Sequence, residues 1–211
     1  TGLNNTGVGY AALYDNTTGQ ENVAVGKDTL ANNTTGHYNT AVGYAALTAA
    51  TTGGENVAIG IAALEDNVSG TQNVAVGGYA LANDTTGGQT AVGYKALTTN
   101  TTGDYVTAMG YNALELNTTG SKNTSFGYKS LEDNTTASFN TAVGYIALNS
   151  NTTGAENTAV GANALTSNST GSYNTAMGVN ALEDNTASHC TAIGYKALCE
   201  NTTGDANTAV G

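Results

Sequence analysis

The side chains that could do chemistry are few in this sequence and widely spaced. His37 and His189 are its two histidines, and each lies in the variable part of a polar connection. No Ser-His-Asp or Cys-His arrangement can be assembled around them from neighbours that recur along the chain. We interpret both histidines as solvated surface residues rather than as catalysts or ligands.

Carboxylates occur in adjacent pairs at several places. Glu65–Asp66, Glu132–Asp133 and Glu183–Asp184 each follow a recurring leucine. A catalytic pair is expected at one unique site, whereas pairs that recur are typical of a solvated outer edge. The sequence also lacks the Gly-Gly-x-Gly-x-Asp repeat of calcium-binding β-rolls. We therefore predict no enzyme activity, no metal site and no cofactor.

The two cysteines, Cys190 and Cys199, are too few for a disulfide framework. One interpretation is that they are near-neutral substitutions in an otherwise polar pattern. A single local disulfide between them is the alternative.

Composition narrows the possible partners. The 211 residues carry a formal net charge of −11, only 10% of them are charged, and there is no Pro and no Trp. Such an acidic surface repels phosphate groups, which argues against nucleic acid and anionic membranes as partners. No apolar run approaches the roughly 18 residues of a membrane span, so we expect no membrane insertion in this segment. Because the chain begins at Thr1 and ends in mid-phrase, we interpret it as a processed form or a segment of a longer array.

A repeat organises the whole chain. A glycine that follows a small residue and then an apolar one recurs every 17 residues, except for two steps of 16. These glycines are Gly9, Gly26, Gly43, Gly60, Gly77, Gly93, Gly110, Gly127, Gly144, Gly161, Gly178, Gly194 and Gly211. A leucine stands four residues after each of the first twelve, giving the consensus N-T-A-V-G-Y-x-A-L-x-x-N-T-T-G-x-x.

This pattern predicts short strands rather than helices. The apolar clusters are two or three residues long and are interrupted by Gly and by Asn-Thr-Thr-Gly, so the sequence has no continuous apolar helical face. We expect two strands per repeat, one around "TAVG" and one around "xAL". One repeat cannot bury its apolar side alone, but stacked repeats can. The sequence therefore predicts an all-β fold, a parallel β-solenoid (β-roll) of about twelve 17-residue turns, forming a single domain over residues 1–211.

Stacking would align equivalent residues into ladders. The expected core ladder is Val42, Leu47, Ile59, Leu64, Val92, Leu97, Met109, Leu114, Val143, Leu148, Val160 and Leu165. Two amide ladders, in which each Asn bonds to its copy one turn away, would include Asn16, Asn33, Asn39, Asn56, Asn117, Asn134, Asn140 and Asn151. The connection glycines, such as Gly19, Gly36 and Gly53, are expected at corners with positive φ. Both one-residue deletions fall in the connection, where an exposed loop tolerates them.

Three further columns suggest contacts with the outside. Tyr44, Tyr94, Tyr111, Tyr128 and Tyr145 each follow a repeat Gly, and such a stripe could bind sugars or a partner surface. The favoured interpretation is that it packs against an adjacent chain or covers the corner of the coil. The Thr pairs of "NTTG" allow an ice-binding face as an alternative. Finally, Asn16, Asn33, Asn100, Asn117, Asn134, Asn151 and Asn201 match the N-x-T glycosylation signal, although turn chemistry explains the same residues.

The adjacent Ala and Val of "TAVG" point to opposite faces of a strand, yet both recur with little variation. Our hypothesis is that one face packs inside the coil and the other against a neighbouring chain. This predicts a homo-oligomer or an end-to-end filament.

The words "NVAVG" (22–26), "NVAIG" (56–60) and the repeated "NTAVG" resemble the head repeats of YadA-like trimeric autotransporter adhesins. The full phrase is also similar to repeat arrays of bacterial and phage tail-fibre-like proteins. The resemblance implies a left-handed β-roll, trimerisation and attachment to a surface. The 17-residue period is longer than the usual one of that family, and no stalk, neck or anchor accompanies it.

Together these observations predict a non-enzymatic extracellular structural or adhesive repeat protein, a rigid rod, fibre or filament segment at a cell surface or phage tail. A cell-surface or glycan receptor is its expected partner. An ice-binding or carbohydrate-binding β-solenoid is the alternative.

Overall fold

The computed structural model describes residues 2–211, and their regular secondary structure consists of three-residue strands. They form two compact units, residues 2–105 and Val106–Gly211, each described by itself. The strands of the first unit are β1 (Thr6–Val8), β2 (Val23–Val25), β3 (Thr40–Val42), β4 (Val57–Ile59), β5 (Val74–Val76) and β6 (Thr90–Val92). Those of the second are β7 (Thr107–Met109), β8 (Thr124–Phe126), β9 (Thr141–Val143), β10 (Thr158–Val160), β11 (Thr175–Met177), β12 (Thr191–Ile193) and β13 (Thr208–Val210).

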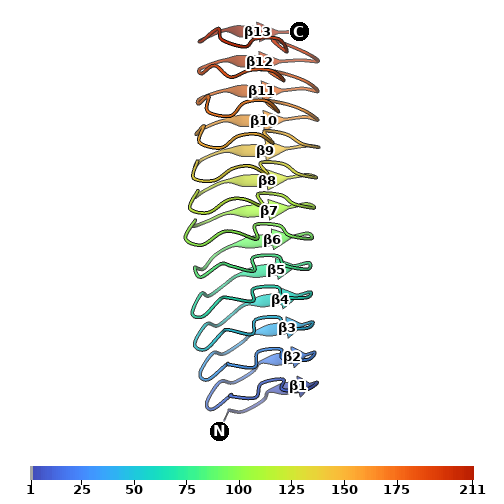
Figure 1. Ribbon diagram of the computed structural model, residues 1–211, viewed down its shortest axis with the longest axis vertical. Coiled ribbons are helices and arrows are strands. Elements are labelled where there is room, and N and C mark those ends of the chain that lie inside the picture. The colour runs from blue at the N-terminus through green and yellow to red at the C-terminus, as the bar shows by residue number, and fades with distance from the viewer. Residues whose placement is uncertain (1) are drawn as a thin grey trace. The chain divides into compact units, whose positions relative to one another are not determined.

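Each unit is a parallel β-solenoid, which confirms the predicted fold class. Within a unit every strand pairs in parallel with the strand of the next repeat, as Thr141 does with Thr158. Paired residues are one repeat apart in the sequence. The two shortened repeats make this separation one residue smaller at Val74↔Thr90 and at Thr175↔Thr191. Figure 1 shows the result within each unit: strand lies over strand, and the rest of each repeat loops away and returns.

The second predicted strand, around "xAL", is absent from the described residues, and this part of the prediction was wrong. The segment is a turn in which two residues of every repeat are left-handed, for example Ile146 at φ 46° and Leu148 at φ 52°. Its backbone is nevertheless held axially on both sides. The Ile146 N–H donates to the Tyr128 carbonyl of the preceding turn at 2.9 Å, and the Leu148 N–H donates to the Ala164 carbonyl of the following turn at 2.9 Å.

The positive-φ glycines are also not the ones predicted. Gly19, Gly36 and Gly53 do not have positive φ; the repeat glycines that end the strands do, between 130° and 144° from Gly9 to Gly194. A Cβ on Gly43 would lie 2.4 Å from the Gly60 carbonyl oxygen. At the connection glycines the reason for Gly is close approach instead, since a Cβ on Gly36 would lie 2.2 Å from the Gly53 carbonyl oxygen.

The core of each turn is an alanine from the strand facing a leucine from the turn. Ala142 and Leu148 are both fully buried, as are their copies in most turns. Two hydroxyls replace two alanines in one repeat: Ser125 and Ser130 are both buried, and the Ser125 hydroxyl donates to the Ser130 carbonyl at 2.7 Å. Because the two serines are hydrogen-bonded to each other, this polar pair is tolerated inside an otherwise apolar core.

Both predicted asparagine ladders are present. In the first, the side-chain amide donates to the previous copy, as Asn33 Nδ2 does to Asn16 Oδ1 at 2.8 Å and Asn134 Nδ2 to Asn117 Oδ1 at 2.7 Å. Asn151 continues it, donating to Asn134 Oδ1 at 3.0 Å. In the second, the side-chain oxygen accepts from the next backbone.

That second ladder includes Asn39 and Asn140. The Asn56 N–H donates to Asn39 Oδ1 at 3.1 Å, and the Asn157 N–H donates to Asn140 Oδ1 at 2.9 Å. Its Nδ2 groups are also used, since Asn140 Nδ2 donates to the Gly154 carbonyl at 2.9 Å. The buried Asn side chains therefore supply the connection backbone with hydrogen bonds that an apolar core could not supply.

Candidate functional site

The outer face of the strands presents an apolar column, which we call the outer strand column. It consists of the last residue of every strand: Val8, Val25, Val42, Ile59, Val76 and Val92 in the first unit, and Met109, Phe126, Val143, Val160, Met177, Ile193 and Val210 in the second. A three-residue strand buries its middle residue and turns the other two outward. Thus Ala142 is fully buried while Val143 is 38% exposed.

This arrangement corrects half of the predicted core ladder. Leu47, Leu64, Leu97, Leu114, Leu148 and Leu165 are fully buried, as predicted. Val42, Ile59 and Val143 are instead exposed, and Val92, Met109 and Val160 are half-buried. The physical reason is that the single strand has only one inward position, and alanine occupies it.

The tyrosine stripe lies beside the outer strand column and stacks on itself. In the second unit the Tyr111 and Tyr128 rings are stacked at 5.5 Å between centroids, and Tyr128 and Tyr145 at 5.3 Å with only 8° between their planes. All three are exposed. Because the ring faces cover one another, the stripe offers mostly ring edges and hydroxyls outward, which is a poor platform for stacking on a sugar. In the first unit Tyr44 and Tyr94 are exposed at the same repeat position.

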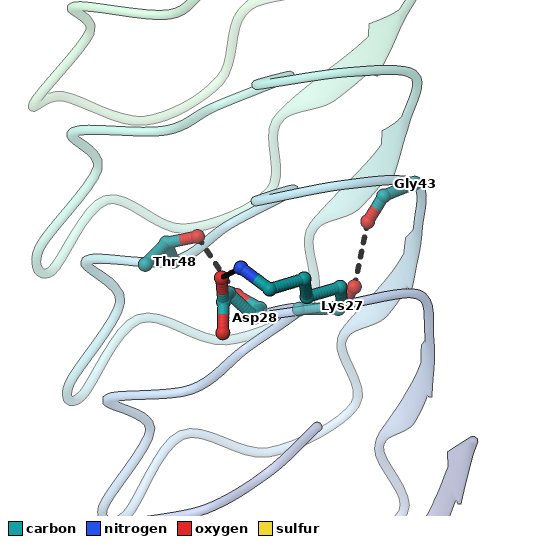
Figure 2. A network of polar contacts seen from close by, with 5 residues as sticks. Lys27, Asp28, Gly43 and Thr48 are labelled. Carbon is teal, nitrogen blue, oxygen red and sulfur yellow. Dashed lines mark hydrogen bonds and ion pairs between the residues drawn. The ribbon is translucent and has the colours of Figure 1, made fainter. Parts of the chain in front are cut away.

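A lysine takes the tyrosine position in one repeat of the first unit. Lys27 Nζ lies 5.8 Å from the Tyr10 ring centroid and 5.1 Å from that of Tyr44. Figure 2 shows Lys27 over Asp28, with Thr48 of the next turn approaching Asp28. Lys27 Nζ donates to Asp28 Oδ2 at 2.6 Å, which raises the pKa of the lysine, and Thr48 Oγ1 donates to the Asp28 carbonyl at 2.9 Å. The cation therefore fills the gap in the aromatic stripe by contacting a ring on either side.

The connection carries the Thr pairs, and hydroxyls there already have partners. Thr34 Oγ1 donates to the Thr51 carbonyl at 2.9 Å, and Thr118 Oγ1 donates to the Thr135 carbonyl at 2.9 Å. These hydroxyls tie successive turns together, which weighs against the connection as an ice-binding face.

Most of the predicted glycosylation positions are inaccessible. Asn33, Asn100, Asn117, Asn134 and Asn151 are fully buried, and Asn16 and Asn201 are half-buried. Each uses its Nδ2, the atom that would carry the sugar, to donate to the backbone carbonyl three residues further on, as Asn134 does to Ala137 at 3.1 Å. Five of these seven positions are therefore incompatible with a glycan on the folded chain, because the ladder occupies them.

The titratable side chains have structural partners. His37 Nδ1 accepts from the Gln20 N–H at 2.9 Å, and the His189 ring stacks on Tyr173 at 5.0 Å. Cys190 is buried, Cys199 is half-buried, and both are free thiols. Within residues 2–211, no group of three His, Cys, Asp or Glu side chains is placed to hold a metal ion. No helix of this described part is long and apolar enough for a membrane span.

One recurring carboxylate pair is held by neighbouring turns. Glu132 accepts from Asn112 Nδ2 at 3.1 Å and from Asn149 Nδ2 at 3.1 Å, and it pairs with Lys129 at 2.9 Å. Burial raises the pKa of Glu132, but the hydrogen bonds from Lys129, Asn112 and Asn149 outweigh it and leave the pKa lowered. Burial, followed by the charge of Glu132, raises the pKa of Asp133. Glu132 thus links its turn to the turns on either side.

The sequence reasoning missed the residues other than Asn that stand in the ladders, such as Gln89 and Cys190, whose N–H groups donate to Asn73 Oδ1 and Asn174 Oδ1 at 2.9 Å. Asp84 stands in the first asparagine ladder and is fully buried. The signal was present, since Asp84 puts a carboxylate at a position that carries Asn in most repeats.

No protein-family model, no curated protein and no solved structure matches this chain. The outer strand column, with the tyrosine stripe beside it, is therefore identified as the candidate site from its own geometry.

Proposed function

We propose that this chain is a non-enzymatic structural repeat segment of an extracellular fibre, stalk or adhesin at a cell surface or phage tail, and that it works as a homo-oligomer. The observation that carries the proposal is the outer strand column. Its members are apolar in every strand of both units, and many of them are exposed. Single exposed apolar residues are ordinary, but a contiguous run of them marks an interaction surface.

A second copy of the chain is the partner that fits best. Strands in a sheet repeat at about 4.8 Å, so two copies of the column can meet turn by turn at the same spacing. The column contains no charged residue, which lets two chains of net charge −11 approach along it without placing like charges in contact. A trimer and an extracellular location are supported by the resemblance to YadA-like head repeats, and an end-to-end filament is the other assembly that a repeat array favours.

The bonding of the recurring polar side chains supports a structural role. Ladder amides, Thr hydroxyls and Glu132 all bond to neighbouring turns. These groups are used to hold the coil rather than to present a reactive site.

Light scattering coupled to size-exclusion chromatography tests the assembly. We expect a mass that is a multiple of the 21.1 kDa chain. Val143→Lys should lower that mass, because it places a charge in the outer strand column. Asn163→Lys adds the same charge at a turn position where other repeats already carry Lys129 or Lys196, so it should leave the mass unchanged. A monomeric wild-type chain would contradict the proposal.

An ice-binding function is the second candidate, and one observation favours it. All seven described strands of the second unit begin with Thr, at 107, 124, 141, 158, 175, 191 and 208, on the outward side of the sheet. This places a Thr column in a strand rather than in the connection. Ice crystals grown with micromolar protein would be faceted by an ice binder, and unaltered growth would reject this candidate.

A further inference from the structure

Asp84 is a buried carboxyl with two very different oxygens. Oδ1 accepts from Asn100 Nδ2 at 2.7 Å and from Thr86 Oγ1 at 2.9 Å. Oδ2 is buried and has no hydrogen-bond partner. A carboxylate would leave half of its charge on that bare oxygen, away from water, at a large cost in free energy.

The preceding turn holds a matching defect. In the regular ladder the oxygen of each Asn accepts from the amide of the next copy, as Asn117 Oδ1 does from Asn134. The oxygen of Asn67, one turn before Asp84, is also buried without a partner, as is the oxygen of Asn168 before the other shortened turn. Two acceptors without a donor therefore occupy successive positions of one ladder, and a protonated carboxyl is a donor that such a ladder could use.

We propose that Asp84 is a proton-binding site: in the folded chain it is a neutral carboxylic acid whose Oδ2–H donates to Asn67 Oδ1. Oδ1 then behaves as an ordinary carbonyl oxygen that accepts from Asn100 and Thr86. The proton comes from water and returns to it, so the site responds to pH alone.

Burial and one neighbouring charge favour the neutral form. Glu65 and Asp66 belong to the turn before Asp84, and Lys95 and Asp104 to the turn after it. Burial is the main cause that raises the pKa of Asp84, and the negative charge of Asp104 adds to it. The hydrogen bonds from Asn100 and Thr86 act in the opposite direction. Asp84 also lies in a shortened turn, where the connection has one residue fewer.

The other shortened turn supplies a comparison. There Asn185 holds the ladder position, its Nδ2 donates to the Ala187 carbonyl at 2.9 Å, and the Asn168 oxygen of the preceding turn has no partner. A neutral amide is therefore compatible with this geometry. Asp84→Asn and Asn185→Asp are matched, opposite substitutions at equivalent positions.

The sign of the pH effect follows from linkage. A carboxyl whose pKa is raised by folding keeps its proton to higher pH in the folded state than in the unfolded chain. Its contribution to stability is complete below the unfolded pKa, about 3.9, and is lost as pH rises through the folded pKa. Near neutral pH, Asp84 should therefore weaken the first unit.

The test is thermal unfolding of the wild type, Asp84→Asn and Asn185→Asp from about pH 4 to about pH 8. We expect Asp84→Asn to raise Tm near neutral pH, with the difference from wild type shrinking as pH falls. Asn185→Asp should lower Tm near neutral pH and recover at low pH. A difference between wild type and Asp84→Asn that does not change with pH would overturn the proposal.

A direct titration keeps the test decisive if a variant fails to fold. The carboxyl ¹³C resonances of aspartate are followed in the wild-type chain as pH is raised. One resonance should titrate well above the ordinary aspartate range, and it should be missing from Asp84→Asn where that variant folds. If every aspartate titrates in the ordinary range, Asp84 is ionised and the proposal is wrong.

Discussion

Replacing one strand-end glycine should be among the most damaging single changes to this chain. Gly127 has φ 144°, and a Cβ there would lie 2.1 Å from the Gly144 carbonyl oxygen of the next turn. A backbone in such a Gly-only region costs on the order of 1–3 kcal/mol for another residue. Relief of the contact would separate the two turns and weaken the 2.8 Å hydrogen bond from Gly144 N–H to the Phe126 carbonyl, adding about 0.5–1.5 kcal/mol. Gly127→Ala should therefore lower the free energy of unfolding by about 1.5–4.5 kcal/mol, measured by urea unfolding followed by circular dichroism.

The matched control is Gly154→Ala in the connection. Gly154 does not have positive φ, and the equivalent positions of two other turns already carry alanine, Ala137 and Ala187. A Cβ there would approach the Gly171 carbonyl oxygen at 2.2 Å, so some adjustment is needed, but the chain makes that adjustment elsewhere. The loss should be clearly smaller than for Gly127→Ala. Equal losses would show that backbone conformation is not what requires glycine at the strand end.

Three further changes probe the core and the ladders. Leu148→Ala should cost about 2–5 kcal/mol in urea unfolding, because Leu148 is fully buried and a rigid stack cannot close the cavity. Asn151→Leu should cost about 1–3 kcal/mol by the same measurement, since it leaves the Asn134 and Gly154 oxygens without the donor they now share. Ser130→Ala should change stability by less than about 1 kcal/mol, because the Ser125 hydroxyl keeps its bond to the Ser130 carbonyl; a larger loss would show that the hydroxyl pair itself is stabilising.

The period of the sequence was enough to predict the class of fold, because equivalent residues can form continuous ladders only if one repeat is one turn. It also predicted the asparagine ladders, since a buried polar column must bond to its own copies. It could not predict the turn around Leu148. A left-handed leucine costs roughly 1–2 kcal/mol locally, so no propensity scale indicates one. Only the axial hydrogen bonds from neighbouring turns make that conformation favourable.

The candidate site could be predicted only in part from the sequence. Strand alternation correctly predicted that Ala and Val of "TAVG" face opposite ways, but the prediction that the valine column faces inward was wrong. The second segment of the repeat is a turn rather than a strand, and its buried leucine faces the buried alanine of the strand. The exposed column at Val143 is thus a consequence of how the leucine turn packs.

The dependence of each turn on its neighbours explains why the repeat varies so little at some positions and freely at others. Each turn holds left-handed residues such as Ile146 and Leu148 that are unfavourable alone, and hydrogen bonds to the turns on either side compensate them. A turn is therefore stable only when its neighbours have the same backbone path. Residues that set the path, the strand-end glycine and the leucine, recur without exception. The side chains of the outer strand column do not set the path, so valine can change to isoleucine, methionine or phenylalanine there. These positions stay apolar although the coil does not bury them fully. This is the strongest reason to expect that a partner outside the chain buries them.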